Sequence, residues 1–471
     1  MKRLWIEEVL QYKGKEAHVL GWVANRRDHG KIIFVDLRDK TGVVQLVFTP
    51  NHKEVYAQAE KLRSEWVIGV TGIVNSRPEA MINPKISTGE LEIEVTDLEI
   101  ISPAKIIPFE IETEGREISE ELRLKYRYLD LRRSRMQQNL INRFKTTSFI
   151  RNYLASYGFI EVETPYLTKS TPEGARDFVV PSRLDPGRFY ALPQSPQQYK
   201  QLLMVGGIER YFQVVRCFRD EDSRGDRQPE FTQLDIEMDF IEEEDILGLI
   251  EKMLKELIEK FFPNKKITQY PFIRLNYNEA ISQYCSDRPD LRQNKNDSDE
   301  LAFAFVVNFP LFEWKEGEKR WDAVHHPFTR PQFLPQETLP ELITRIKQAP
   351  HTIMAHQYDV VLNGYEIGGG SLRISEPELL EAVFELLGHS PETINQQFGH
   401  LLEAFDFGVP PHGGIALGLD RVLMILLNEP SIREVIAFPK TGDGRDLMIK
   451  APAEIDEKQL RELRLKIIKD N

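Results

Sequence analysis

The clearest alternation of apolar and polar positions lies in residues 211–240, where two strand-like segments flank a charged loop. Tyr211–Phe218 is apolar and aromatic, and residues 233–240 alternate strictly between polar and apolar side chains. A period of two over such lengths predicts two strands. The loop between them is too long for a tight hairpin and contains three arginines, with Arg219 at the strand end. Guanidinium groups placed there suit bidentate capture of phosphate, and a solvated charged loop is the alternative.

The first hundred residues show the pattern of a small all-β unit. Turn residues separate short alternating segments, and a single helical segment interrupts them after the third strand. The expected strands are Ala17–Arg26, Lys31–Asp39, Gly42–Thr49, Trp66–Arg77 and Glu90–Ile101, with a helix near His52–Arg63. Three strands, a helix and two strands is the order of an OB-fold barrel, which commonly binds single-stranded nucleic acid. We therefore expect a β-barrel domain over residues 1–103.

Residues 104–133 are expected to form a hinge. Pro103 and Pro108 interrupt the pattern, and Ser119 can cap a helix that has acidic residues in its first turn. The helix expected over Leu122–Arg133 is rich in arginine and lysine. A basic helix beside an OB-fold suits contact with an RNA backbone, and a solvated helix face is the competing interpretation.

Residues 134–471 are expected to form one α+β domain. A long helix runs from Ser134 to Tyr157 and ends before Gly158, a typical C-cap residue. The further expected elements are a strand at Phe159–Thr164, an amphipathic helix at Ile246–Phe262, a strand pair over Tyr358–Ile374, a strand at Gly413–Asp420 and a helix at Val422–Leu427. Residues 286–300 are polar without periodicity and predict a loop.

Composition narrows the class of protein. The 471 residues are 41% hydrophobic and 29% charged, typical of a globular protein, and they contain only two cysteines. No apolar run spans a membrane and no signal-peptide core is present, so a reducing cytoplasm is the expected location. The net charge of −13 argues against sequence-blind binding to nucleic acid. It does not argue against a specific partner met by local basic patches, and we expect no DNA partner.

Three signatures now occur in order, and together they resemble motifs 1, 2 and 3 of the class II aminoacyl-tRNA synthetases. They are the long helix and strand ending at Pro165, the FRDED…FTQ hairpin and the GLDR sequence at Gly418–Arg421. Shorter sequence segments, namely TPEGARDF, QSPQ, HHPFT and NGYEIGGGS, resemble those of bacterial-type aspartyl-tRNA synthetase. This implies an OB-fold anticodon domain and a catalytic domain on an antiparallel sheet flanked by helices. Members usually have an inserted domain where this sequence has only residues 286–300.

The resemblance implies an ATP site with Mg²⁺. Arg219 would bind the α-phosphate and the attacking carboxylate, and Arg421 would meet the γ-phosphate and one face of adenine. Phe231 would stack on the other face of adenine. Asp359 and Glu366 would hold Mg²⁺, a hard cation that prefers oxygen ligands. The implied catalytic residues are Arg219, Arg421 and Glu366, and the remaining ATP-site residues are Asp220, Glu221, Gln228, Gly418, Leu419 and Asp420.

The resemblance also implies an L-aspartate site. Lys200 and Arg373 would bind the second carboxylate, with Asp235 orienting Lys200, because such a site needs buried positive groups. His325 and His326 would close over the substrate. The residues that resemble the family's contacts to the backbone of the amino-acid substrate are Glu173, Gln197 and Gln233. This pattern argues against an asparaginyl or lysyl relative, and intact Arg219, Glu366 and Arg421 argue against a catalytically silent RNA-binding regulator.

The partners implied by the resemblance are tRNA(Asp) and a second copy of the chain, joined through the first signature as a homodimer. In the barrel, residues that resemble anticodon contacts are Arg27, Phe34, Gln45 and Glu92. Family enzymes that accept only tRNA(Asp) tend to have leucine and lysine where this sequence has His29 and Ala80. We therefore expect that tRNA(Asn) is also charged, and a strictly tRNA(Asp)-specific enzyme is the alternative.

Overall fold

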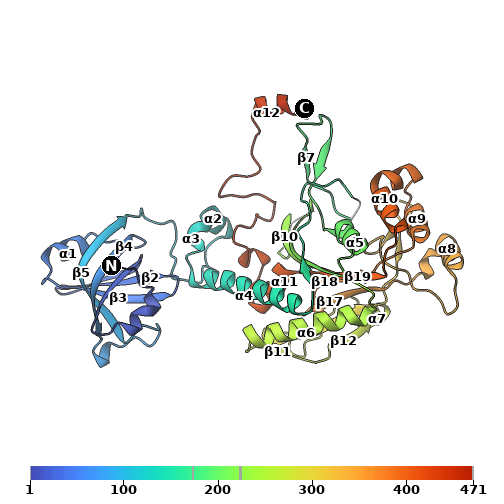
Figure 1. Cartoon of the computed structure of the whole chain (residues 1–471). Coiled ribbons are helices and arrows are strands. Elements are labelled where there is room, and N and C mark those ends of the chain that lie inside the picture. The colour runs from blue at the N-terminus through green and yellow to red at the C-terminus, as the bar shows by residue number, and fades with distance from the viewer. Residues whose placement is uncertain (1, 172–173, 222–224, 469–471) are drawn as a thin grey trace. The chain divides into compact units, whose positions relative to one another are not determined.

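The computed structural model describes residues 2–171, 174–221 and 225–468, which form two compact units, residues 1–118 and 119–471 (Figure 1). The division falls inside the predicted hinge. The elements of the first unit are η1 Ile6–Gln11, β1 Glu16–His29, β2 Ile32–Asp39, β3 Gly42–Phe48, α1 Lys53–Ala59, β4 Val67–Ser76, η2 Glu79–Met81 and β5 Leu91–Ser102.

The first unit is a closed barrel with the strand order β1-β2-β3-β5-β4. Only β3 and β5 pair in parallel, and β4 closes the barrel against β1. Inward positions alternate with outward ones, so Ile33, Val35 and Leu37 of β2 are buried in the barrel core while Phe34 faces outward. The predicted five-stranded OB-fold is confirmed, with strand ends shifted by a few residues.

The second unit contains the remaining elements. Its helices are α2 Glu120–Lys125, α3 Arg127–Asp130, α4 Ser134–Ser156, α5 Gln197–Val205, α6 Glu243–Phe261, α7 Tyr277–Tyr284, α8 Leu339–Gln348, η3 Pro350–Thr352, α9 Pro377–Leu386, α10 Pro391–Asp406, α11 Leu419–Leu426, η4 Ile432–Glu434 and α12 Glu457–Glu462. Its strands are β6 Ile160–Glu161, β7 Val179–Pro181, β8 Phe189–Ala191, β9 Arg210–Phe218, β10 Glu230–Asp239, β11 Lys266–Ile267, β12 Ile273–Asn276, β13 Glu300–Leu301, β14 Phe303–Val307, β15 Phe312–Lys315, β16 Arg320–Ala323, β17 Gln357–Leu362, β18 Tyr365–Leu372 and β19 His412–Gly418.

An eight-stranded sheet in the order β12-β14-β17-β18-β19-β10-β9-β6 organises this unit. The two edge pairs, β12 with β14 and β6 with β9, are parallel, and the six central strands pair antiparallel. The sheet is therefore mixed at its edges and antiparallel where the predicted site lies. The strand expected at residues 159–164 is reduced to β6, because only two of its residues pair with β9.

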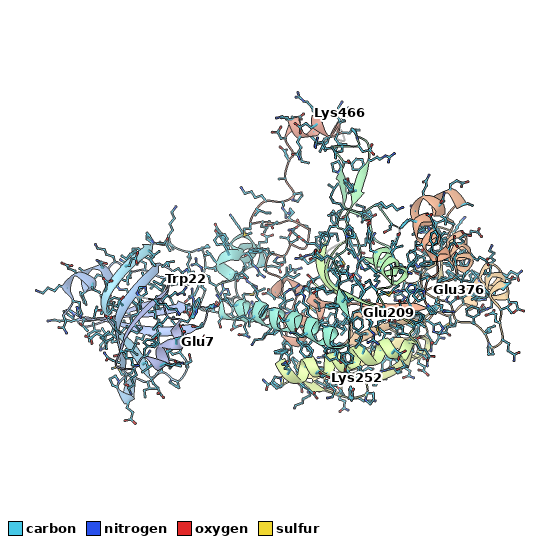
Figure 2. All side chains as sticks on the ribbon, in the orientation of Figure 1. Glu7, Trp22, Glu209, Lys252, Glu376 and Lys466 are labelled. Atoms are coloured by element: carbon cyan, nitrogen blue, oxygen red, sulfur yellow. The ribbon has the colours of Figure 1, made fainter. Side chains whose placement is uncertain are left out.

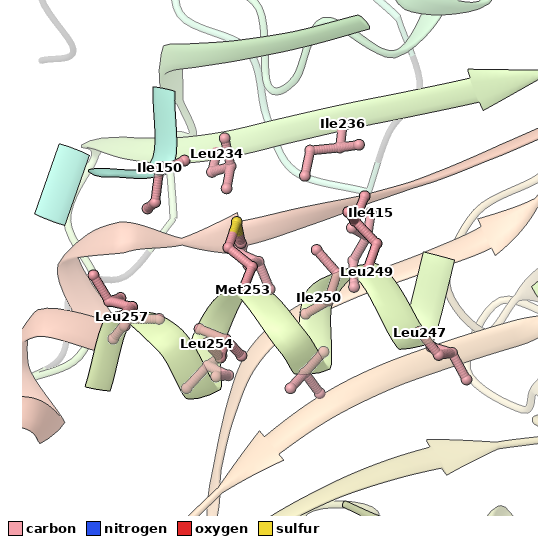
Figure 3. Close-up of a cluster of buried hydrophobic side chains, with 14 of the residues drawn as sticks. Ile150, Leu234, Ile236, Leu247, Leu249, Ile250, Met253, Leu254, Leu257 and Ile415 are labelled. Carbon is pink, nitrogen blue, oxygen red and sulfur yellow. The ribbon is translucent and has the colours of Figure 1, made fainter. Parts of the chain in front are cut away.

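Helices α4 and α6 cover one face of this sheet (Figure 1). Leu249, Ile250 and Met253 of α6 pack against Leu234 and Ile236 of β10, and Ile150 of α4 and Ile415 of β19 join the same cluster (Figure 3). On the opposite side of α6, Lys252 is exposed (Figure 2). One face of the central strands is thus filled by the core, which leaves the other face for polar side chains.

The predicted basic helix over 122–133 is wrong as an RNA-binding face. The segment forms two short helices, α2 and α3, whose arginines point into the unit. Arg123 lies 2.9 Å from Asp130 and 2.6 Å from Glu434, while Arg127 and Arg133 lie 2.7 and 2.8 Å from Asp130. These arginines are buried, because Asp130 and Glu434 neutralise them. The alternative of a solvated face is wrong for the same reason.

Residues 286–300 form the predicted irregular connection, which ends in β13, a two-residue strand paired with β11. Glu300 accepts hydrogen bonds from the backbone of Gln293 and Asn294, and Arg292 pairs with Asp290 at 2.8 Å. The connection is therefore held by its own polar side chains. Among the described residues, no helix is both long and apolar enough to cross a membrane.

Candidate active site

A cavity of about 370 Å³ lies on the polar face of the large sheet. Its walls come from α5, β10, β18 and β19, together with the loop after β9 and the residues that follow β16. Most of the predicted site residues line it, namely Gln197, Lys200, Arg219, Glu221, Gln228, Phe231, Gln233, Asp235, His325, His326, Glu366, Arg373, Gly418, Asp420 and Arg421. Segments far apart in the sequence therefore meet at one cavity.

The alternation along β10 explains why the polar side chains gather there. Leu234 and Ile236 face the helix-covered core, so Asp235 and Glu237 point to the opposite face. The small residues of β19 make room for them, because a Cβ atom on Gly414 would collide with the carboxylate of Glu237. The small-residue strand recognised in the sequence thus forms the floor beneath a set of buried charges.

Four charged side chains form a buried cluster in this wall. The Lys200 ammonium lies 2.5 Å from Asp235 and 3.1 Å from Glu237, and the Arg373 guanidinium lies 2.8 Å from Glu237. Burial by itself raises the pKa of Glu237, but Arg373 and Lys200 more than compensate and hold it at about 2. Two cations are therefore fixed beside the cavity. Glu237 was missed by the sequence analysis, although its position two residues after Asp235 on a strand was a usable signal.

The two predicted catalytic arginines face the cavity from different elements. The Arg219 guanidinium lies 5.2 Å from the ring centre of Phe231, and its buried Nε has no hydrogen-bond partner among the described residues. At the start of α11, Arg421 pairs with Asp226 at 3.2 Å and donates to the backbone carbonyl of Glu366. A cation and an aromatic ring thus line the part of the cavity predicted to hold ATP.

The adjacent histidines have opposite electrostatic environments. The Nε2 atom of His325 lies 3.1 Å from Asp359. Burial alone would lower the pKa of His325, but Asp359 and Glu366 raise it to about 9. For His326, burial and the charges of Arg373 and Lys200 lower the pKa well below its usual value. His325 is therefore a cation at neutral pH and His326 is a neutral ring.

The predicted metal ligands lie on neighbouring strands. Asp359 of β17 and Glu366 of β18 are two ladder positions apart, and burial followed by the charge of Asp359 raises the pKa of Glu366. Asp359 accepts hydrogen bonds from Gln357 and contacts His325, and it does not line the cavity. Within residues 2–171, 174–221 and 225–468, no three His, Cys, Asp or Glu side chains form a metal-binding group. A cation here would need further oxygens from its ligand.

Two of the predicted ATP-site residues hold neighbouring segments together, and one of them, Asp420, links the three signature segments. The Asp420 carboxylate accepts from the backbone of Thr232 at 2.9 Å and also from Arg143 of α4, which in turn donates to the Thr232 hydroxyl at 2.9 Å. The Gln228 side chain makes two hydrogen bonds with the backbone of Lys440. Both residues line the cavity and also fix the elements around it.

The other predicted residues do not join this cavity. Asp220 lies 3.7 Å from Arg176, outside the lining, and the Leu419 side chain is buried in the helix-covered core. Leu419 is therefore a packing residue. Glu173, the remaining predicted aspartate contact, lies outside the described residues.

In the barrel, the predicted anticodon residues form a continuous row on the outer face. Arg27 pairs with Phe34 across β1 and β2, and Gln45 of β3 aligns with Glu92 of β5. Arg27 donates to Gln45 at 3.3 Å, and Gln45 donates to Glu92 at 2.9 Å. Asp36, 2.9 Å from Arg27, belongs to the same row and was not predicted. His29 and Ala80 are exposed at the end of β1 and in η2.

Comparisons with known proteins agree with this architecture. Residues 119–442 match the family "tRNA synthetases class II (D, K and N)", and residues 17–101 match "OB-fold nucleic acid binding domain". The chain is 43% identical to aspartate–tRNA(Asp/Asn) ligase of Dictyoglomus turgidum, over 97% of the chain and 96% of that relative. It is 42% identical to the aspartate–tRNA(Asp/Asn) ligase of Thermodesulfovibrio yellowstonii, over 96% of the chain and 97% of that relative.

The first of these alignments extends over 578 positions, more than the 471 residues of the chain, so part of it is a gap in this chain. Among solved structures, the fold resembles asparaginyl-tRNA synthetase from Pyrococcus horikoshii, with a TM-score of 0.74 and 24% identity over 94% of the chain and 98% of that structure. That likeness concerns the fold.

Proposed function

The chain belongs to the class II tRNA synthetases of the D, K and N group, and we propose that it attaches L-aspartate to tRNA(Asp) and tRNA(Asn). The observation that carries this proposal is the buried cluster of Lys200, Asp235, Glu237 and Arg373 on the cavity wall. Its two cations can bind the side-chain carboxylate of aspartate. Asparagine offers these cations no second carboxylate, and polar pairing of this kind discriminates by up to roughly 10⁴–10⁵-fold.

Activation uses ATP. An oxygen of the aspartate α-carboxylate attacks the α-phosphorus, and the bond from that phosphorus to the pyrophosphate oxygen breaks, which yields aspartyl-adenylate. The charge on the transition state spreads over phosphate oxygens, so fixed cations supply most of the stabilisation. In this proposal, Arg219 binds the α-phosphate and the attacking carboxylate, and Arg421 binds the γ-phosphate. Adenine lies between Arg421 and Phe231.

Mg²⁺ is proposed at Glu366 and Asp359. Burial and the nearby charge of Asp359 raise the pKa of Glu366, and a divalent cation beside both carboxylates would relieve their repulsion. Two carboxylates are a small ligand set, which suits Mg²⁺ because that ion usually completes its shell with substrate phosphates and waters. When bound, the ion would neutralise charge on the phosphates. Asp359 would have to release its contact with His325 or share it.

In the second step, the 3′-hydroxyl of the terminal tRNA adenosine attacks the adenylate carbonyl, and AMP leaves. No protein nucleophile is needed. The backbone of aspartate is proposed to lie against Gln197 and Gln233, with His325 and His326 over the substrate. Glu221 and Gln228 are proposed to lie around the nucleotide. Gly418 and Asp420 complete that end of the cavity.

The barrel is proposed to bind the anticodon through Arg27, Phe34, Gln45 and Glu92. Stacking on an aromatic side chain and hydrogen bonds to base edges are the usual modes for single-stranded RNA. The aspartate and asparagine anticodons differ only at their third base, so few side chains are needed for discrimination. His29 and Ala80 are proposed to leave this base unselected, and the relatives whose names include both tRNA(Asp) and tRNA(Asn) support dual charging.

Two further features complete the proposal. A homodimer is proposed through α4 and β6, where Phe144 is 70% exposed and Ile160 is 53% exposed. Large apolar side chains exposed together on neighbouring elements suit a surface that a second copy covers. The gap in the alignment with the relatives is proposed to fall at residues 286–300, where the sequence lacks the expected inserted domain.

The direct test is aspartate-dependent exchange of pyrophosphate into ATP, followed by aspartylation of tRNA(Asp) and tRNA(Asn) transcripts side by side. Exchange with aspartate, and not with asparagine or lysine, supports the assigned amino acid. Similar efficiency on both transcripts supports dual charging, and a preference of a hundredfold or more for tRNA(Asp) would establish the strictly specific enzyme. Absence of exchange would leave the chain as an RNA-binding relative without catalysis.

A further inference from the structure

A series of hydrogen bonds reaches from the start of β19 to the cavity through α5. The Nδ1 atom of His412 lies 2.8 Å from the carbonyl oxygen of Pro410. The Nε2 atoms of His412 and Gln201 lie 3.1 Å apart, and the Nε2 atom of Gln197 donates to the Oε1 of Gln201 at 3.1 Å. All three side chains are buried, and Gln197 lines the cavity. None of these bonds involves the charged cluster directly.

The direction of every bond in this series follows from its first member. A carbonyl oxygen can only accept, so His412 must have its proton on Nδ1, which leaves Nε2 of the neutral ring as an acceptor. The atom of Gln201 that faces Nε2 must then be its NH₂ group, and the Gln201 oxygen faces Gln197. The NH₂ group of Gln197 faces that oxygen. Its own Oε1 is consequently the atom left for the cavity.

The ring of His412 is kept neutral by its surroundings. Burial has the largest effect and lowers its pKa, while Glu237 and the Pro410 carbonyl oppose burial in part. The charges of Arg373 and Lys200 lower the pKa by smaller amounts. An imidazolium would present N–H groups on both sides and would meet the NH₂ group of Gln201 with a second donor. The neutral ring therefore fixes the amide orientation, which an isolated glutamine could reverse at little cost.

An acceptor facing the cavity matters because the cations on the cavity wall offer no oxygen to an ammonium group. Lys200, Arg219 and Arg373 offer only N–H groups, which suit the two carboxylates of aspartate. The α-ammonium group of aspartate has three donors and no acceptor, and it needs oxygens. Among the described residues, no group donates a hydrogen bond to the Oε1 of Gln197, so this oxygen is available to the substrate.

We propose that His412 and Gln201 are positioning residues that turn the amide oxygen of Gln197 toward the ammonium group of aspartate. This inference rests on the proposed function and adds to it two residues that never touch the substrate. A reversed Gln197 amide would place N–H groups against an ammonium ion. A hydrogen bond to a charged group contributes about 1.5–3 kcal/mol, so its loss weakens binding by about tenfold or more.

The test uses Gln201→Met in the full-length protein, because methionine keeps the length of the side chain and removes both hydrogen bonds. In aspartate-dependent pyrophosphate exchange, we expect the KM for aspartate to rise about tenfold, while kcat and the KM for ATP stay within about twofold. The matched control is Gln198→Met, the neighbouring buried residue of α5, which lies beside a different cavity. It should leave the KM for aspartate unchanged.

Succinate separates positioning from a general structural role, because it is aspartate without the ammonium group. Its inhibition constant against aspartate should be the same in the wild type and in Gln201→Met. A proportional weakening of succinate, or an unchanged KM for aspartate, would overturn the inference. If Gln201→Met fails to fold, His412→Leu removes the acceptor from the other end of the series and should give the same pattern. A wild-type protein without exchange would instead refute the proposed function.

Discussion

The ammonium group of Lys200 lies 2.5 Å from the carboxylate of Asp235, and both side chains are buried on the wall of the cavity. The other carboxylate oxygen of Asp235 has no hydrogen-bond partner among the described residues. The pair thus combines a close charge contact with an unused acceptor, in a place where burial raises the pKa of Asp235. Lys200, which is proposed to bind the substrate, therefore depends on its acidic partner for both stability and direction.

Lys200→Met should destabilise the protein by about 3–5 kcal/mol, because it leaves a buried carboxylate with one partner fewer. The double variant Lys200→Met with Asp235→Leu should lose less, since it removes both charges. Urea unfolding of the two variants and the wild type measures this. Both variants should lack activity with aspartate. A double variant less stable than Lys200→Met would contradict the assigned coupling.

Arg219→Ala should lower aspartate-dependent pyrophosphate exchange by about 10²–10³-fold, because a preorganised donor at the reacting phosphate contributes about 3–4 kcal/mol. The fold should survive, since the guanidinium packs on Phe231 and makes no ion pair among the described residues. Circular dichroism checks the fold. Arg320→Ala, on an exposed hairpin of the same unit, is the control and should behave as wild type. Exchange within a few-fold of wild type in Arg219→Ala would refute its role.

Phe144→Glu should convert the proposed homodimer into a monomer, because it places a charge where the α4 surface is expected to be covered. Light scattering at micromolar concentration gives the mass directly. Phe407→Glu is the matched control, since Phe407 is 81% exposed after α10 and should not affect the mass. A wild-type monomer with full activity would exclude the dimer.

Asp239→Asn should stabilise the protein above neutral pH. Burial, with smaller effects from Glu209 and Glu237, raises the pKa of Asp239 to about 7 from its ordinary value near 3.8. Between these values the folded state binds more protons than the unfolded state, so stability falls as the pH rises from about 4 to about 7, and the contribution of this group is lost above that pH. Unfolding free energies at pH 5 and pH 8 should show a smaller decrease in Asp239→Asn than in the wild type. Equal decreases would contradict the assignment.

His29→Leu combined with Ala80→Lys should lower aspartylation of tRNA(Asn) relative to tRNA(Asp) by about tenfold or more, which corresponds to about 1.4 kcal/mol of discrimination. Initial rates with the two purified transcripts measure the ratio. The control is His52→Leu with Ala57→Lys, the same two changes at the helix α1 of the barrel. An unchanged ratio in the first variant would show that these positions do not read the anticodon.

The sequence by itself determined the barrel, the order of the strands and most of the site residues. Alternation along residues 233–240 requires that Asp235 and Leu234 face opposite sides, whatever the strand pairs with, because successive side chains of a strand point to opposite faces. The signature segments placed Arg219, Glu366 and Arg421 at one site through their resemblance to a family. These are local patterns, which can be recognised in the sequence without knowledge of the fold.

Only the tertiary structure decided which charges are buried and which are paired. Arg123, Arg127 and Arg133 were expected on a basic helix face, yet all three are buried against Asp130. Arg123 also pairs with Glu434, some three hundred residues away. The structure also places Glu237 in the buried cluster with Lys200 and Arg373, and it places Leu419 in the hydrophobic core instead of the site. Whether a charge is solvated or neutralised depends on partners distant in sequence, since desolvation and Coulomb energy are set by distances in space.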